Sequence, residues 1–272
     1  MNLSQRRFLV SQVGVVQRLA IDYYRLARQI PGGFGKVFQE TKTSYYLWED
    51  RNKGKILTRR QQLALKKNFD DLGKLAIFAA LQSIPVVGTV PMIVALTYPR
   101  LLLTSQFWSD EQKETFQLQE YDERCHYTLE LVKYVSNRQA SLSSTQHFPL
   151  VCLSQEHINL LAGANSVYGH DMIYRIAPKF LTLHMMERIS AFLCKDDILL
   201  RSEGLDDMCV AELREALLQR GIKPLKGDVS EFKESLNAWL QAHENFGNKS
   251  SYILHAVAMG QVQNSPIPRE VA

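Results

Sequence analysis

The sequence is poor in the residues that mark fibrous and low-complexity proteins. Only 14 glycines and 9 prolines occur among 272 residues, and no segment repeats at a fixed period. These absences exclude collagen-like, low-complexity and solenoid architectures. Because 46% of the residues are hydrophobic, the chain has enough apolar side chains to form a folded core.

Sequence patterns that hold metals or perform nucleophilic catalysis are also missing. No serine or cysteine has a recognisable nucleophile motif, and Asp196-Asp197 resembles an exposed pair after a helix. The sequence predicts no catalytic residue, no metal site and no cofactor, and therefore a protein that is not an enzyme. The cysteines are too far apart for a zinc or thioredoxin-like motif, so each is expected to be a small buried hydrophobic residue. They are Cys125, Cys152, Cys194 and Cys209.

Positive charge is concentrated in the N-terminal part of the chain. Residues 1–72 carry 14 Lys/Arg against 6 Asp/Glu, whereas residues 101–272 carry 16 against 22. The basic part suits anionic lipid headgroups, and the acidic remainder argues against a broad nucleic-acid surface, so no direct DNA binding is expected. Arginines at positions 6, 7 and 18, with no acidic residue before Asp22, resemble a mitochondrial targeting segment.

Two helices are predicted in the basic part. Apolar residues recur at helical spacing over residues 8–30, a break is expected at residues 31–35, and a short aromatic segment then leads to a polar turn at residues 50–55. The second helix begins at Thr58, which can form a capping box with Gln61, and continues to about residue 72. Its basic residues are candidates for binding anionic lipid, with a solvated helix face as the alternative. They are Arg59, Arg60, Lys66 and Lys67.

Residues 75–99 contain no charged residue and lie between Lys74 and Arg100. As one helix they would extend roughly 37 Å, more than the roughly 30 Å hydrocarbon core of a bilayer. We expect one transmembrane helix with a kink, because prolines remove internal hydrogen bonds and a threonine hydroxyl can satisfy a freed carbonyl. The alternative is a buried helical hairpin that turns at residues 87–89. The residues of the expected kink are Pro85, Gly88, Thr89 and Pro91.

Helical patterns continue to residue 240. A charged helix is predicted over residues 109–137, and the later helices have caps in sequence. Ser154 caps one helix, Pro178 opens another that ends near Leu193, Asp206 or Asp207 caps a third that stops at Gly221, and Ser230 caps the last. The predicted fold class is all-α. The predicted parts are residues 1–57 (amphipathic and aromatic), 58–103 (basic helix and transmembrane segment) and 104–272 (helical soluble domain).

Three stretches occur in an order that resembles a known family. They are LTRRQQLALKKNFDDLGKL after Leu47-Trp48; IPVVGTVP with YPRLLLTSQFW; and CLSQEHINLLAG, CKDDILLRSEG and VAELREALLQRGI with Trp239-Leu240 beyond them. Together they are similar to the LETM family (leucine zipper and EF-hand containing transmembrane proteins), especially its short LETM domain-containing members. The resemblance implies a mitochondrial inner-membrane protein whose residues 104–272 form a 14-3-3-like ribosome-binding domain in the matrix.

The leading hypothesis is therefore a membrane-anchored adaptor that contacts the mitochondrial ribosome or another matrix partner. The family has also been proposed to exchange cations for protons, so an exchanger or regulator of ion transport is the alternative, and it would be a homo-oligomer because one span cannot enclose a path. Exchanging members carry an acidic residue among the membrane prolines, where this chain has Gly88 and Thr89. The chain also lacks a calcium-binding EF-hand loop and a sustained heptad pattern.

Two further points stay open in the sequence. Residues 205–240 are similar to the SAP nucleic-acid-binding motif, but their excess of acidic residues favours simple helix packing. The positive-inside rule would put the basic N-terminal side in the matrix, whereas the family topology puts the C-terminal domain there. The conflict stands, because an imported protein need not obey the rule.

Overall fold

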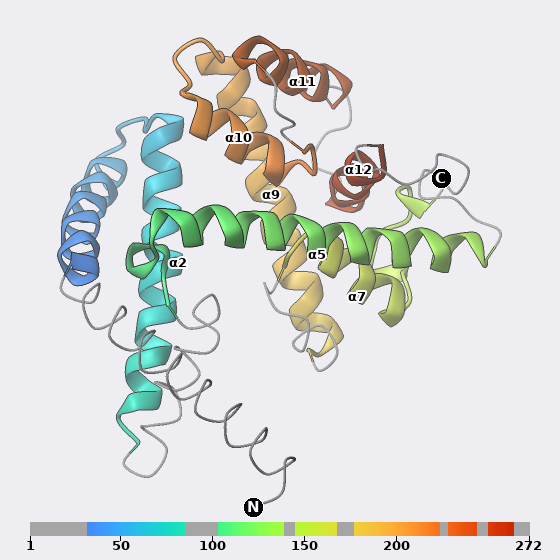
Figure 1. The fold of residues 1–272 in the computed structure, drawn as a ribbon, viewed down its shortest axis with the longest axis horizontal. Helices are drawn as coiled ribbons and strands as arrows, with labels where there is room; N and C mark the ends of the chain where they lie inside the picture. Colours follow the sequence, from blue (N-terminus) through green and yellow to red (C-terminus); the bar gives the residue numbers. More distant parts are fainter. Residues whose placement is uncertain are drawn as a thin grey trace, which may run out of the picture. The chain divides into compact units, whose positions relative to one another are not determined.

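A computed structural model of the chain shows a helical protein (Figure 1). No strand occurs among the residues that the structure describes, so the all-α prediction is confirmed. The described residues are 32–84, 103–138, 145–167, 177–223, 228–243 and 250–263. The predicted helix and targeting segment within residues 1–30 lie outside them.

The chain forms two compact units, residues 1–116 (unit 1) and 117–272 (unit 2). The boundary lies inside a helix, α5 (Asp110–Ser136), which is the charged helix expected over residues 109–137. The sequence-based division after residues 57 and 103, which was made by expected role, stays a prediction.

Two helices in unit 1 run side by side in opposite directions (Figure 1). The first covers residues 32–52, and after a turn at Gly54 the second, α2 (Arg59–Gln82), begins. The predicted capping box of α2 is confirmed, because Gln61 N donates to Thr58 Oγ1 and Thr58 N donates to Gln61 Oε1. The helix continues past the predicted end at residue 72 and contains the first residues of the predicted membrane segment.

The helix over residues 32–52 differs from the sequence prediction, which placed a break and a short aromatic segment there. Gly33 lies inside this helix and is buried against the ring of Phe107, where a Cβ atom would collide with the ring. Glycine costs helix stability in isolation. Here it allows the helix to pack closely on a residue that is distant in sequence, a contact that local propensity does not reveal.

A small apolar cluster holds unit 1 together. Leu103 and Phe107 are its buried members, and Leu75 and Phe78 of α2 pack against them. Phe107 belongs to a short 3-10 helix, η1 (Ser105–Phe107), and its ring meets that of Phe34 edge to face. The cluster therefore joins the first helix, α2 and the chain that follows residue 102.

Unit 2 contains the C-terminal part of α5 and the helices that follow it. Ser154 and Pro178 precede helices as predicted, and Gly221, with φ 75°, follows the end of α10. Cys209 and Asp228 precede α10 and α11, so the predicted caps at residues 206–207 and 230 are wrong. The elements are η2 (Leu150–Cys152), α7 (Gln155–Ala164), α9 (Lys179–Glu203), α10 (Val210–Gln219), α11 (Val229–Ala242) and α12 (Ser250–Gln263).

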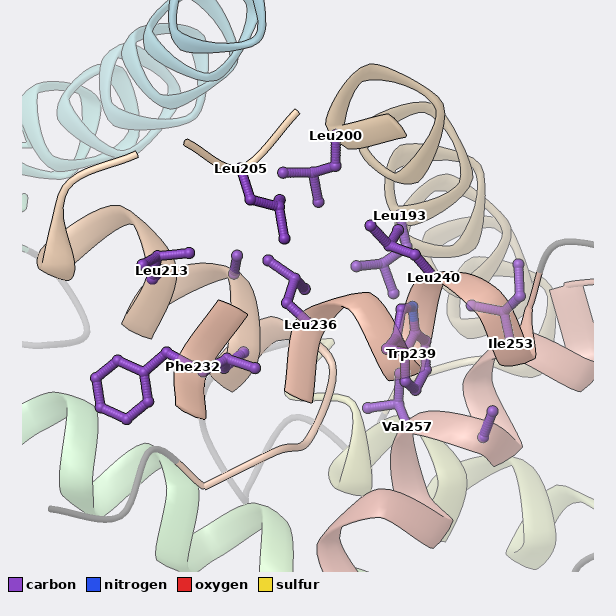
Figure 2. Packing of buried hydrophobic residues seen from close by; sticks show 13 residues of the cluster. Leu193, Leu200, Leu205, Leu213, Phe232, Leu236, Trp239, Leu240, Ile253 and Val257 are labelled. Atoms are coloured by element: carbon purple, nitrogen blue, oxygen red, sulfur yellow. The ribbon is translucent and has the colours of Figure 1, made fainter. Parts of the chain in front are cut away.

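Two apolar clusters form the core of unit 2. In one, Leu131 of α5, Ile158 of α7 and Met186 of α9 pack together. In the other, leucines of α9, α10 and α11 point toward one another and Trp239 closes one side (Figure 2). Helices α9 and α12 contribute to both clusters. This shared packing explains why α9 continues beyond the predicted end at Leu193.

Candidate functional site

The four predicted lipid-binding residues lie in the first half of α2, and they differ in their exposure to solvent. Arg60, Lys66 and Lys67 are exposed, whereas Arg59 is buried with 5% of its surface accessible. Lys66 Nζ lies 3.3 Å from Asp70 Oδ2. Because residues seven positions apart lie nearly in line on a helix, Arg60, Lys67 and the exposed Lys74 form a row, which we call the cationic stripe.

The four predicted kink residues, Pro85, Gly88, Thr89 and Pro91, lie outside the described residues. In the part of the chain that the structure does describe, no helix combines the length and hydropathy needed to cross a membrane. The described part of the predicted membrane segment is residues 75–84, and α2 includes those up to Gln82.

The two flanks of that segment are in direct contact. Gln106 Nε2 donates to Asp71 Oδ2 at 2.7 Å and to Glu40 Oε2 at 2.6 Å, so one amide bridges two carboxylates. Burial raises the pKa of Asp71 above its ordinary value, although the hydrogen bond from Gln106 opposes the shift. Asp71 precedes the uncharged stretch and Gln106 follows it. No local sequence pattern marks this cluster, because its members come from three separate segments.

This contact bears on the expected single crossing. A helix over residues 75–99 would separate its ends by roughly 37 Å. In unit 1, however, Leu75 and Phe78 pack with Leu103 and Phe107, next to the hydrogen bond between Asp71 and Gln106. Described residues before and after the uncharged stretch therefore pack in one cluster of unit 1. The residues between Ile84 and Leu103 lie outside the described residues, so the expected single crossing and its hairpin alternative both stay predictions.

Apolar side chains are exposed at the same end of unit 1. Phe38 of the first helix is 72% exposed and Ile77 of α2 is 61% exposed. Phe34, four residues before Phe38, and Ile84, which follows the end of α2, are also exposed. The opposite end, at the turn between the helices, instead carries the exposed ion pairs Lys53–Glu49 and Lys55–Asp50. Exposed apolar side chains are not confined to one end, because Ile56 beside the turn is 92% exposed.

Unit 2 contains a buried cluster of charges that the sequence did not reveal. Arg220 donates from Nη2 to Asp196 Oδ2 at 2.8 Å and to Asp197 Oδ1 at 2.6 Å, and Trp239 Nε1 donates to Asp197 Oδ2. The expectation of an exposed acidic pair is wrong, since Asp196 and Asp197 are buried within α9. Because the guanidinium of Arg220 is fully enclosed, it cannot contact a nucleic-acid phosphate in the SAP-like interpretation of this region.

Two buried histidines link α7 to α12. His157 Nε2 lies 3.0 Å from His255 Nε2, and Ser251 O lies 2.7 Å from His255 Nδ1. Burial lowers the pKa of each imidazole to about 4, and for His157 the neighbouring His255 adds to the shift. Near neutral pH both rings are uncharged, so one can donate to the other. This arrangement is a structural contact between helices rather than a site open to substrate.

An exposed apolar patch lies where η2 meets the start of α9. Lys179 Nζ donates to the carbonyl oxygens of Val151 and Leu153 and thereby ties α9 to η2. Around this link Phe148, Val151 and Phe180 are exposed, with Phe180 at 75%. We call these three residues the apolar patch. Grouped exposed apolar side chains of this kind are typical of protein-binding surfaces.

A shallow pocket and the cysteines complete the candidates in unit 2. The pocket, about 430 Å³, is lined by residues from the end of α9 and from α11, and Leu205 and the ion pair of Lys233 with Asp206 also line it. Cys152 and Cys209 are exposed, so the expectation that each cysteine is buried is wrong for these two. No group of three or more His, Cys, Asp or Glu residues suited to a metal occurs among the described residues.

Comparison with known proteins identifies the family. A family model described as "LETM1-like, RBD" matches residues 57–149 and 140–259, and thus covers α2 and the helices of unit 2. No curated protein matches the chain. The match extends over most of the sequence and includes all three stretches on which the resemblance rested. The chain belongs to the LETM1-like family.

Proposed function

We propose that the chain is a non-enzymatic adaptor of the mitochondrial inner membrane, and that unit 2 binds the mitochondrial ribosome or another matrix partner. The match to a LETM1-like RBD over residues 57–259 carries this proposal, because that family is associated with this membrane and its model is named for a ribosome-binding domain. Unit 2 supports a binding role, since its buried charges hold helices together and the apolar patch is exposed.

Membrane association is supported by the end of α2. From Leu75 to Gln82 the helix has no charged residue, and Ala76, Ile77 and Ala80 are exposed on it. Exposed apolar surface of this kind is unfavourable in water. The uncharged sequence that follows, up to residue 99, makes a bilayer the most suitable environment for this end of unit 1.

The cationic stripe supports contact with anionic lipid. Arg60, Lys67 and Lys74 are exposed on the helix that leads to the uncharged stretch. Each Lys or Arg close to an anionic membrane surface contributes about 1 kcal/mol of attraction. The stripe therefore holds α2 beside lipid headgroups, whereas the buried Arg59 contributes to the fold of unit 1.

The test is carbonate extraction of mitochondria followed by co-sedimentation of detergent-solubilised protein with mitoribosomes on a gradient. We expect the protein in the carbonate pellet and in ribosomal fractions, and we expect Val151→Ser with Phe180→Ser to move it out of those fractions. The matched control is Ile198→Ser, which changes a residue of α9 that is 60% exposed and outside the apolar patch. Release by carbonate would overturn the membrane anchor, and absence from ribosomal fractions would overturn the ribosome partner.

A further inference from the structure

We infer that the shallow pocket at the end of α9 binds the C-terminal residue of a partner polypeptide. The carboxylate of that residue contacts Lys233 and Arg201, and its aliphatic side chain contacts the leucines that line the pocket. The site lies at the opposite end of α9 from the apolar patch, and α9 extends roughly 30 Å from Phe180 to Leu200. The inference therefore goes beyond the proposed ribosome contact and does not depend on it.

The apolar part of the pocket consists of three leucines. Leu200 belongs to the last turn of α9, Leu205 follows that helix, and Leu240 lies near the end of α11. All three are buried members of the cluster in Figure 2. Gly204, with φ 78°, ends α9 and allows the turn that places Leu205 in this cluster. A hollow with this lining can cover an aliphatic side chain of a ligand.

Two basic residues line the same pocket. Arg201 Nη2 donates to the carbonyl oxygen of Leu240 at 2.8 Å, and no carboxylate pairs with this guanidinium among the residues that the structure describes. Lys233 Nζ lies 3.1 Å from Asp206 Oδ1, so a carboxylate already binds at this ammonium group. The lining thus carries two positive charges against one negative charge.

The carboxylate of Asp206 can be replaced by that of a ligand. The Asp206 side chain is 99% exposed, whereas that of Lys233 is 27% exposed. An ion pair with such an exposed partner contributes little stability. A ligand carboxylate at the same ammonium group would gain the contact with Arg201 as well. The charges of the pocket are therefore complementary to a single carboxylate.

Two exposed amides continue along α11 from Lys233. Asn237 and Gln241 lie four and eight residues after it, so the three side chains share one face of the helix. Neither amide forms a side-chain hydrogen bond within the described part of the chain. A side-chain amide both donates and accepts, as a peptide backbone does. These amides suit the residues that precede the C-terminal residue of a bound polypeptide.

Other anionic ligands fit this pocket less well. An acyl chain requires a deep cavity, whereas this pocket is shallow. A nucleic acid carries many phosphates, and the exposed Asp207 and Glu234, next in sequence to Asp206 and Lys233, would repel it. A chain end instead joins one carboxylate and one side chain at a single carbon atom. Capture of a C-terminal carboxylate is an established mode of peptide recognition.

The test uses the full chain in detergent and two pools of fluorescein-labelled hexapeptides. Both pools end in leucine and are random at the other positions, but one has a free C-terminal carboxylate and the other has a C-terminal amide. Fluorescence anisotropy should show that the carboxylate pool binds about tenfold more tightly than the amide pool, because only a carboxylate pairs with the two cations. Equal affinities, or no binding of either pool up to about 1 mM, would overturn the inference.

Substitutions test whether the peptides bind in this pocket. Lys233→Gln removes a charge and should weaken binding of the carboxylate pool about tenfold. Asp206→Asn frees the ammonium group of Lys233 and should strengthen binding about threefold, a gain that misfolding cannot produce. The matched control is Lys195→Gln, at an exposed position of α9 outside the pocket, and it should leave the affinity unchanged.

The outcomes separate this inference from the proposed function. Equal losses in Lys233→Gln and Lys195→Gln, or weaker binding by Asp206→Asn, would show that the carboxylate binds elsewhere and would overturn the inference. Val151→Ser with Phe180→Ser should keep the peptide affinity of the wild type, although it is expected to abolish ribosome association. Loss of peptide binding in that double variant would likewise contradict a separate site at the end of α9.

Discussion

Arg220 and Asp197 form an ion pair that is closed to solvent, with Nη2 and Oδ1 2.6 Å apart and the side chains 0% and 7% exposed. Arg220 also bonds to Asp196 and to the carbonyl oxygen of Ala216, so its charge is neutralised within the core. Arg220→Met would leave two carboxylates buried without their cation. We expect it to lower the free energy of unfolding by about 3 to 5 kcal/mol, measured by urea denaturation.

Arg214→Met is the matched control for this prediction. Arg214 is exposed on the same helix, α10, and removing its charge should change the stability by no more than about 0.5 kcal/mol. If the two variants unfold at the same urea concentration, the buried ion pair does not hold α10 to α9.

The histidine pair predicts a loss of stability in acid. Each imidazole has a pKa of about 4 in the folded protein, below the ordinary value of 6.5, so the unfolded chain binds more protons between these values. The stabilising effect of the neutral pair is complete above about pH 6.5 and decreases as the pH falls toward 4, by about 1.4 kcal/mol for each unit of pKa shift. Urea midpoints measured across this range should therefore decline with acidity.

A substitution separates this effect from general acid denaturation. His255→Gln keeps an amide that can hydrogen-bond to His157 but removes one titrating group. We expect a shallower decline in stability between pH 6.5 and 4 than in the wild type. His126→Gln is the control, because His126 is exposed on α5, and it should leave the slope unchanged. An unaltered slope in His255→Gln would show that other groups cause the decline.

Arg124 joins the ends of two helices, and its removal should be costly. Its Nε donates to Ala164 O at the end of α7, and its Nη1 donates to Leu218 O in the last turn of α10. Carbonyls at helix ends lack partners within the helix and carry partial negative charge. We expect Arg124→Met to destabilise the protein by about 2 to 3 kcal/mol in urea denaturation.

The geometry of the guanidinium gives this prediction a second test. Arg124→Lys keeps the charge but cannot serve two separate carbonyls with a planar fork, so it should restore less than half of the lost stability. Lys133→Met, at an exposed position of the same helix, should have little effect. Full rescue by lysine would mean that charge alone, and not the paired hydrogen bonds, matters at this position.

Local sequence signals predicted the starts of α2, α7 and α9, but not those of α10 and α11. Thr58 with Gln61 and Ser154 are caps in the structure because a cap depends on residues within one turn. The all-α fold class was predictable for a similar reason, because helical periodicity is also a local pattern in the sequence. Helix α12 was missed, since its small and apolar residues surround the helix and give no amphipathic period.

The candidate sites were less accessible to sequence reasoning, because they depend on contacts between distant segments. In the sequence, Asp196 and Asp197 resemble a solvent-exposed acidic pair. In the folded protein, the packing of α9 on α10 brings Arg220 into contact with both of them. The bridge from Gln106 to Asp71 likewise has no sequence pattern. Periodicity correctly placed the basic residues on a helix, but it could not show that Arg59 faces inward.

The cationic stripe predicts salt-dependent binding to anionic lipid. Reversing all four originally predicted residues would include the buried Arg59, where a carboxylate would disturb the fold. The better variant reverses Arg60, Lys67 and Lys74 to glutamate. With about 1 kcal/mol for each basic residue, it should bind cardiolipin-containing vesicles at least tenfold more weakly at low salt, with little change on neutral vesicles. Vesicle flotation at two salt concentrations measures both effects.

A control with the same change in net charge decides whether position matters. Arg51, Lys53 and Lys55 are exposed near the turn at the other end of the helix pair, and reversing them alters the charge of unit 1 equally. If the stripe lies beside the membrane, this control should retain most of the binding, because screening weakens attraction beyond about 10 Å at 0.1 M salt. Equal losses in the two variants would mean that net charge alone draws the protein to anionic lipid, and the stripe would have no special role.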